Sequence, residues 1–178
     1  MRAWLAATAA ALALCASPAL AQKTKSPAAP QSVAALEVCE QFARGDVLAV
    51  DNANAKGWDA YATDTESPYV RSYSASRDLP GIGLANLFAL VEDYPETTFG
   101  YCRLDVMEPT GRNGAQQIEA IQGLDRYEGT GETVSDGTFA SLKGTSETAQ
   151  SLLLAHWTET SFVIQLTVIT PTATAETE

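Results

Sequence analysis

Few residues in this sequence stand in a pattern that identifies a nucleophile or a general base. The only histidine is His156, which lies in a largely apolar stretch. The chain contains no Gly-x-Ser-x-Gly nucleophile elbow and no Gly-x-x-x-x-Gly-Lys phosphate loop. If His156 acts as a base in a small hydrolase-type enzyme, the fold must bring carboxylates to it. The alternative is a structural histidine that is hydrogen-bonded on a sheet face.

Carboxylates are plentiful, but their spacing defines no acid–base pair. Glu92, Asp93 and Glu96 surround a turn, and Asp64 and Glu66 lie in a polar loop. Carboxylate catalysis needs two such groups held across a cleft in different environments, which spacing alone does not establish. We therefore expect solvated loops at both places.

Motifs for metals and cofactors are incomplete. Two cysteines and one distant histidine do not provide the four ligands of a structural zinc site. The segment 51–54 resembles a calcium loop, but alanines stand where oxygen ligands are required. The pair Gly81 and Gly83 begins a dinucleotide fingerprint, and Asn86 replaces its third glycine. We expect no metal and no cofactor.

A possible binding surface follows from alternation along two predicted strands. In the stretch 98–106, the period of two places Tyr101, Arg103 and Asp105 on the face opposite Cys102. His156 and Gln165 occupy the same kind of face on a C-terminal hairpin. If these strands share one sheet, its open face combines aromatic, cationic and hydrogen-bonding groups, as protein or small-ligand contacts do. The alternative is a solvated face with cross-strand pairs.

Two cysteines, Cys39 and Cys102, are expected to form a disulfide. Cys39 lies in a predicted helix among apolar neighbours, and Cys102 lies on the core face of its predicted strand. Their bond would attach the first helix to this strand. Closure of such a long loop stabilises the fold by about 4 kcal/mol in the chain-entropy model.

The first 21 residues have the pattern of a secretory signal peptide: a basic start, an apolar run and an Ala-x-Ala end at Ala21. Cys15 lies within the apolar run after Leu14, which does not suit a lipoprotein signal, so we expect its loss on cleavage. The product would be periplasmic in a Gram-negative host and otherwise extracellular. We expect a flexible leader over 22–31, one domain over 32–170 and a disordered tail over 171–178.

The charge balance favours a basic partner. The formal net charge is −11, and loss of Arg2 with the signal peptide makes it −12. An acidic surface of this kind repels nucleic acid and anionic membranes. No later apolar run approaches the roughly 20 residues that span a bilayer, so we expect no membrane insertion after cleavage. The oligomeric state is not indicated.

The periodicity predicts helices before each of two groups of strands. Ser32 is a suitable N-cap for a helix that ends at Gly45, and a segment over 47–56 ends at Gly57, as one bent helix or two short ones. Strands are expected over 69–75, 84–92 and 98–106, although 84–92 also suits a helix. A short helix capped by Asn113 and ended by Gly123 follows, and the stretch 127–143 is expected to hold one or two short strands.

The clearest element is a hairpin of strands 150–157 and 162–169, with Trp157 paired to Phe162. The whole pattern predicts an α+β domain: a mainly antiparallel sheet, an N-terminal bent helix and a second short helix packed on one face, and one disulfide. The favoured hypothesis for function is a secreted, non-enzymatic protein that binds through its surface, for example to a basic envelope protein. The alternatives are the hydrolase-type enzyme using carboxylates and His156, and an accessory domain that binds a small ligand.

Overall fold

A computed structural model describes residues 29–172 of the chain. The predicted signal peptide, most of the predicted leader and nearly all of the predicted tail lie outside these residues. The described part forms three helices and eight strands, which are α1 Gln31–Ala43, α2 Ala49–Ala55, β1 Asp59–Thr63, β2 Val70–Leu79, β3 Gly83–Asp93, β4 Thr97–Met107, α3 Gly114–Gln122, β5 Tyr127–Val134, β6 Gly137–Gly144, β7 Gln150–Thr158 and β8 Ser161–Pro171. None of its helices has the length and apolar character needed to cross a membrane.

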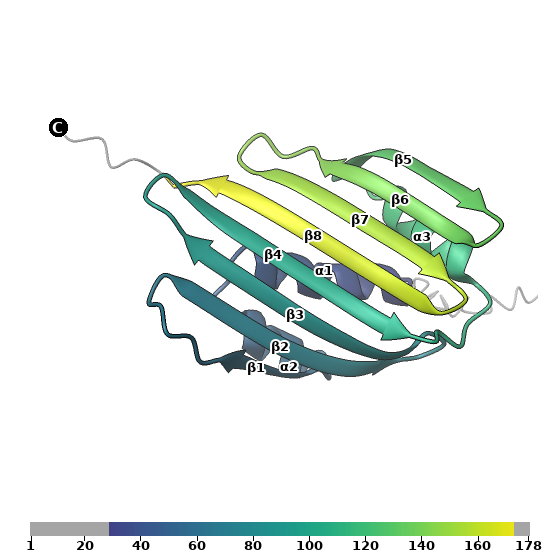
Figure 1. Cartoon of the computed structure of the whole chain (residues 1–178), viewed down its shortest axis with the longest axis horizontal. Coiled ribbons are helices and arrows are strands. Elements are labelled where there is room, and N and C mark those ends of the chain that lie inside the picture. Colours follow the sequence, from purple (N-terminus) through teal and green to yellow (C-terminus); the bar gives the residue numbers. More distant parts are fainter. Residues whose placement is uncertain (1–28, 173–178) are drawn as a thin grey trace, which may run out of the picture.

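All eight strands form a single antiparallel sheet in the order β1-β2-β3-β4-β8-β7-β6-β5. Strands β1–β4 follow one another across one half, and β5–β8 return through the other half (Figure 1). The first and last groups of strands therefore meet at the β4–β8 pair in the middle of the sheet. The α+β class with a mainly antiparallel sheet is confirmed.

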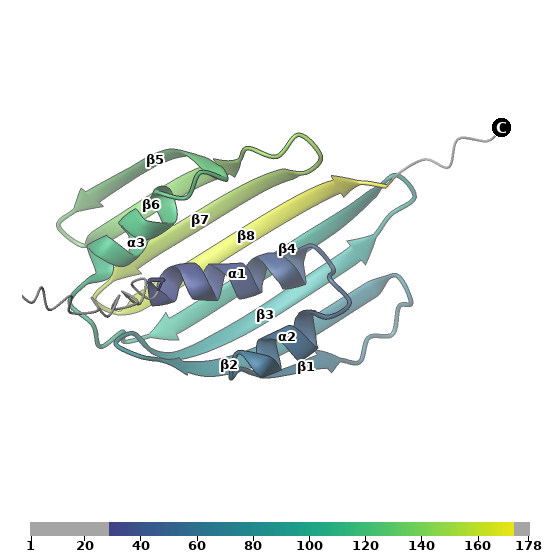
Figure 2. The ribbon, with the colours of Figure 1, turned by 180° about the vertical axis from the view of Figure 1, so that it is seen from behind.

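The helices lie over one face of the sheet, and the other face carries none of them (Figures 1 and 2). Helix α1 packs on β3, β4 and β8, α2 on β1, and α3 on β5, β6 and β7. Between these layers lies one hydrophobic core, whose largest fully buried side chains are Phe42, Phe162, Leu36, Leu79, Ile82, Leu104, Ile118, Ile121, Leu142, Leu153, Ile164 and Leu166. The helix-covered face thus holds the apolar half of each alternating strand.

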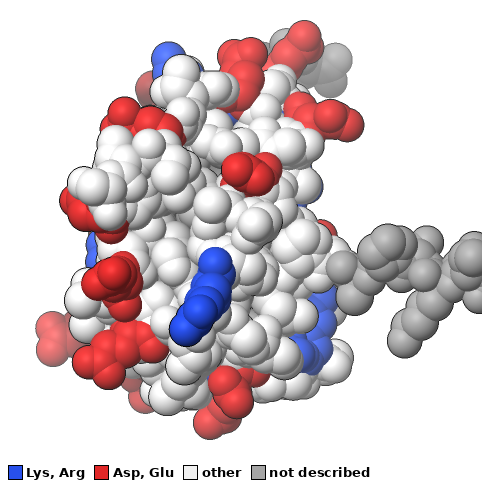
Figure 3. Space-filling model, turned by 90° about the vertical axis from the view of Figure 1, so that its right-hand side faces the viewer, with Lys and Arg blue, Asp and Glu red and all other residues white. Residues whose placement is uncertain are grey.

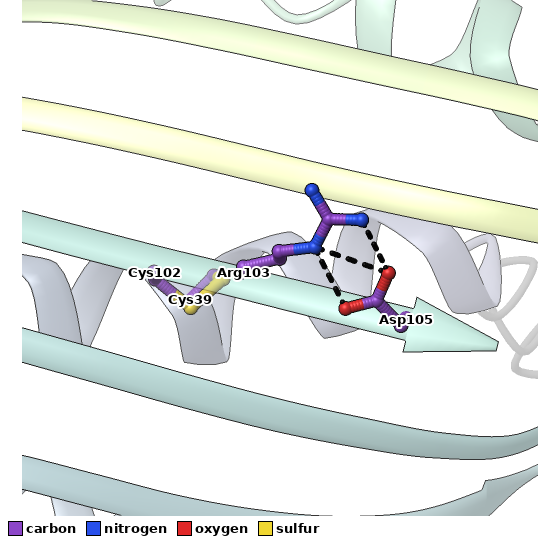
Figure 4. The surroundings of a disulfide bond; sticks show 4 residues. All are labelled: Cys39, Cys102, Arg103 and Asp105. Carbon is purple, nitrogen blue, oxygen red and sulfur yellow. Dashed lines mark hydrogen bonds and ion pairs between the residues drawn. A yellow bond between two sulfur atoms is a disulfide. The ribbon is translucent and has the colours of Figure 1, made fainter.

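The predicted disulfide is present between Cys39 of α1 and Cys102 of β4. Both cysteines are fully buried, as are Leu104 and Val106 on the same face of β4. Figure 4 shows the bond behind β4, on the opposite side from Arg103 and Asp105.

Helix α1 approaches β4 most closely at Gly100. A Cβ atom at this position would overlap the carbonyl oxygen of Ala43 in the last turn of α1. Glycine is therefore required here for the backbone of the helix to reach the backbone of the sheet.

Two helix ends differ from the expectation, and the structure decides between the two alternatives for the N-terminal region. Helix α1 begins after Pro30, and Ser32 lies inside it, where its hydroxyl donates to the Gln117 carbonyl at 2.8 Å. The serine therefore joins α1 to α3 instead of capping its own helix. Asn113 makes no side-chain capping bond to α3. The N-terminal region is two separate helices rather than one bent helix, because Gly45 turns the chain at a φ of 70°.

The strands agree better with the sequence pattern. The segment 84–92 is a strand, β3, and the segment 127–143 holds β5 and β6. The hairpin of β7 and β8 has the predicted register, with Trp157 opposite Phe162. Strand β1 was not predicted. At the other end β8 includes Pro171, and the Thr172 N–H donates to the Glu96 carbonyl at 2.8 Å, so the described sheet passes residue 170.

Candidate binding surface

The predicted candidate residues all lie on the face of the sheet that no described helix covers, which we call the open face. Figure 1 looks onto this face. The strand registers place its side chains in rows, and the central row from β1 to β5 reads Tyr61, Ser74, Phe88, Arg103, Gln165, Leu154, Ser141 and Thr130. A row of mixed character therefore runs across the full width of the sheet.

Arg103 is at the centre of the open face and is fixed by two neighbours. Its Nε donates to both carboxylate oxygens of Asp105, at 2.9 and 3.1 Å, and its Nη2 donates to Asp105 Oδ1 at 2.8 Å (Figure 4). Its Nη1 donates to Gln165 Oε1 on the adjacent strand at 3.2 Å. The hydrogen bonds to Asp105 raise the pKa of Arg103, so the guanidinium keeps its charge. The Arg103 side chain remains 43% exposed and can still contact a partner.

Tyr101 and His156 flank this group on the same face. Tyr101 lies two residues from Arg103 on β4, between Leu90 of β3 and Thr167 of β8. His156 is on β7, where Val163 separates it from Asp105. The structure thus brings Arg103, Asp105 and Gln165 into direct contact, and places Tyr101 and His156 beside them.

The surroundings of His156 are those of a structural side chain. Its Nε2 lies 3.3 Å from Ser161 Oγ, and its ring packs on Phe139 with a centroid separation of 5.8 Å. Desolvation by burial, followed by the charge of Arg103, lowers its pKa, so the ring is neutral at pH 7. Among the described residues, no carboxylate is hydrogen-bonded to this ring. The arrangement lacks the orienting acid of a nucleophile–histidine–acid triad.

Large apolar side chains surround the polar group on the open face. They include Tyr61 of β1, Leu84 and Phe88 of β3, Leu152 and Leu154 of β7, and Ile169 of β8, with exposed fractions of 39–58%, and Met107 at the end of β4, which is 71% exposed. Apolar groups around a fixed arginine are typical of the centres of protein interfaces. The sequence signal for them was the run of leucines on both faces of β7.

Two hollows lie over the β5–β8 half of this face. The first has a volume of about 470 Å³, and its open-face lining consists of Thr130, Glu132, Phe139, Ser141, Leu154 and His156. The second has a volume of about 510 Å³, and its lining includes Lys143, Gln150, Leu152, Thr167 and Ile169. Neither of these two hollows brings two carboxylates together, so their lining supports binding better than hydrolysis catalysed by a pair of carboxylates.

Two carboxylates of the acidic clusters noted in the sequence accept hydrogen bonds from other side chains. Asp93 accepts two hydrogen bonds from Arg71 Nη2, at 3.0 and 3.1 Å, and Glu92 accepts one from the Tyr94 hydroxyl. This hydrogen bond raises the pKa of Tyr94. Within residues 29–172, no group of three or more histidine, cysteine, aspartate or glutamate side chains is placed to hold a metal ion.

Comparison with known proteins does not assign a family. No protein-family model, curated protein or solved structure matches this chain. The geometry of the open face therefore carries the functional argument.

Proposed function

We propose that this chain is an exported, non-enzymatic binding protein and that its open face contacts a basic protein of the cell envelope. The observation that carries the proposal is the apolar surface around the Arg103–Asp105–Gln165 group, on a sheet face that no helix of residues 29–172 covers. The fixed polar group would orient a partner, and the apolar side chains would supply buried area.

The charge of the molecule supports a basic partner. The chain contains 22 acidic and 11 basic residues. Figure 3, a view from the right-hand side of Figure 1, shows acidic side chains at many points of that end and few basic ones. Such a surface attracts a cationic protein at long range and gives an association rate that falls with salt.

The compartment follows from the predicted signal peptide together with the disulfide. Disulfides persist in oxidising compartments such as the periplasm and the extracellular medium. The Cys39–Cys102 bond agrees with export. In a Gram-negative host we place the mature protein in the periplasm.

A small-ligand site is the second candidate function, and the hollow of about 510 Å³ favours it. Leu152 and Ile169 offer apolar contacts there, and Lys143 offers a positive charge. These groups would suit a ligand with an apolar body and one anionic group.

The test is capture from a native envelope extract with matched variants. Phe88→Glu and Leu154→Glu each place a charge in the apolar surface of the open face. Val47→Glu is the control, because Val47 is 86% exposed in the α1–α2 connection and adds the same charge elsewhere. We expect a basic protein to be retained by the parent chain and by Val47→Glu, released by high salt, and lost from both open-face variants.

Two results would contradict the proposal. One is retention of the same protein by all four chains, which would separate binding from the open face. The other is a captured protein that is acidic or whose retention does not depend on salt. Urea unfolding of each variant must first show a cooperative transition, so that loss of binding is not caused by loss of the fold.

A further inference from the structure

The two edges of the sheet differ in how their outward-facing backbone groups are hydrogen-bonded. Strand β1 forms one edge and β5 forms the other. An edge strand presents unpaired backbone N–H and C=O groups, which can pair with a strand of another chain. Whether these backbone groups already have partners within the chain decides which edge can pair with another strand.

At β1 a side chain from α2 occupies the edge. Asn54 Oδ1 accepts from the Ala60 N–H at 2.9 Å, and Asn54 Nδ2 donates to the Ala60 carbonyl at 3.1 Å. The amide thus takes both hydrogen bonds that a neighbouring strand would make to this residue. Because β1 is only five residues long and Ala60 is its second residue, this contact blocks the first part of the edge.

At β5 the pairing register with β6 and one hydrogen bond determine which backbone groups face outward. The Thr145 N–H donates to the Arg126 carbonyl at 3.1 Å, immediately before Tyr127 pairs with Gly144. Hydrogen-bonded and non-hydrogen-bonded pairs alternate along an antiparallel ladder. The backbone groups that point away from β6 therefore belong to residues 127, 129, 131 and 133.

Most of these groups have no partner within the described part of the chain. The Tyr127 N–H donates to the Leu124 carbonyl. Gly129, Gly131 and Thr133 make no outward backbone hydrogen bond among residues 29–172. Every residue from Glu128 to Val134 is exposed.

Strand β5 also lacks two of the common protections of a free edge. Proline and lysine commonly prevent pairing at edges, and the sequence from Tyr127 to Val134 contains neither. One side of the strand is closed by α3, because a Cβ at Gly131 would overlap the Gln122 side chain. On the open face the strand presents Glu128, Thr130 and Glu132.

The two glutamates indicate which strand fits. Antiparallel pairing of β5 with β5 of a second copy, in the register that pairs residue 127 with 133, places Glu128 opposite Glu132 twice. If the register is shifted so that residue 129 pairs with residue 133, the two copies of Glu132 occupy diagonal positions. Like charges at such positions destabilise a sheet, whereas lysine or arginine there stabilises it.

We propose that β5 is a strand-addition site for an extended, basic segment of a partner protein, with lysine or arginine at alternate positions beside Glu128 and Glu132. The added strand would bind the backbone groups of Gly129, Gly131 and Thr133 and would extend the sheet to nine strands. The inference rests on the proposed function for the basic character of the partner. It uses a different part of the molecule from the centre of the open face.

The probe is a blocked nine-residue peptide of alternating lysine and threonine, measured by fluorescence anisotropy. Its partner probe has the same sequence with N-methyl groups on alternate residues along one edge, which keeps the charge and removes the donors. We expect the unmodified peptide to bind the full chain at least about tenfold more tightly than the methylated one. Equal binding of the two peptides would overturn the proposal, because it would show charge attraction without strand pairing.

Variants of β5 locate the site. Thr133→Pro removes one outward N–H and leaves the donors to β6 in place, and Glu128→Lys with Glu132→Lys reverses the charges of the edge. Each is expected to weaken peptide binding at least about tenfold. The matched control, Asp51→Lys with Glu66→Lys, makes the same charge change at exposed positions far from β5 and should change binding less than about twofold. A control that weakens binding as much as the β5 variants would also overturn the proposal.

Two further outcomes separate this inference from its rivals. A dimer of the parent chain in sedimentation, converted to monomer by Thr133→Pro, would assign the edge to a second copy and reject the basic segment. If the parent chain captures an envelope protein, this capture requires Phe88 and Leu154, and the peptide does not bind, the edge site is rejected and the proposed function is retained. Peptide binding without any envelope capture would support the edge site and reject the proposed function.

Discussion

The same strands give the two faces of the sheet opposite properties. On β4, Cys102, Leu104 and Val106 are fully buried under α1, while Tyr101, Arg103 and Asp105 alternate with them on the open face. The covered face contains the core and the disulfide. The open face contains exposed apolar side chains and a fixed ion pair. Stability should therefore depend on one face, and contact with partners on the other.

The ion pairs of the two faces make this difference concrete. The Glu40 side chain on α1 is 10% exposed, and it accepts from Arg126 Nε at 2.7 Å and from the Tyr127 hydroxyl at 2.8 Å, while the Arg126 side chain is 38% exposed. Burial, followed by the charge of Glu40, raises the pKa of Tyr127, so the phenol remains a donor. The Arg103–Asp105 pair has similar distances, but its side chains are 43% and 33% exposed. Solvent screening makes the second pair the weaker contribution to folding.

Removal of the disulfide should have the largest effect on stability. Cys39→Ala with Cys102→Ala opens a link between residues 63 apart in the sequence, and the chain-entropy model gives a loss of about 4 kcal/mol in the free energy of unfolding. Urea unfolding of the variant against the oxidised parent measures this loss. A loss below about 1 kcal/mol would show that packing of α1, rather than the crosslink, holds the covered face together.

Replacement of the buried carboxylate should have the next largest effect. Glu40→Ala leaves the Tyr127 hydroxyl and Arg126 without their acceptor, and we expect a loss of about 2 kcal/mol. Glu37→Ala is the control, because Glu37 is exposed on the same helix and should lose less than about 0.5 kcal/mol. Equal losses in urea unfolding would mean that removal of any carboxylate from α1, not of the buried acceptor in particular, explains the effect.

The edge protected by α2 should show a smaller loss. Asn54→Ala removes the two hydrogen bonds to Ala60, and we expect a loss of about 1 kcal/mol because the site is partly solvated. Asn52→Ala, two residues earlier in α2, removes an amide for which no such bond exists among the described residues, and it serves as the control. Exposure of the β1 edge should also raise the self-association of Asn54→Ala in sedimentation. If Asn52→Ala behaves identically, the amide does not protect the edge.

The ion pair of the open face should contribute less than any of these. Arg103→Ala is expected to change the free energy of unfolding by less than about 1 kcal/mol, because the pair is solvated. The same variant should reduce envelope capture, since it removes the hydrogen-bonding group that we propose orients the partner on the open face. A large loss of stability with unchanged capture would reverse the roles that we assign to the two faces.

Periodicity in the sequence predicted much of this architecture because alternation is a local property. The face of each residue in 98–106 and the Trp157–Phe162 register followed from the period of two and from one hairpin loop. The disulfide followed from two cysteines in a chain that is predicted to be exported. These features need no knowledge of distant contacts, and all are confirmed.

Other features depend on contacts that local pattern does not contain. Ser32 has the sequence features of a helix cap, but the carbonyl of Gln117, 85 residues away, competes for its hydroxyl. Strand β1 was missed because Tyr61 is the only large side chain among its five residues, and its edge is completed by Asn54. The neighbours of Arg103 across the sheet became known only with the strand order, which places β8 beside β4.

The smallest expected effect concerns His156 and the pH dependence of stability. Burial, followed by the charge of Arg103, lowers its pKa in the folded state, so the unfolded chain takes up a proton first as the pH falls below about 6.5. Folding should therefore lose a small amount of stability between about pH 7 and pH 5 that His156→Gln does not lose. The urea midpoints of both chains are measured at each pH. Both chains have the same carboxylates, so the difference between their midpoints reports the contribution of His156 alone. A parent chain that gains stability relative to His156→Gln on acidification would require a protonated ring bound to an acid, and the open face would then contain the catalytic pair that its geometry argues against.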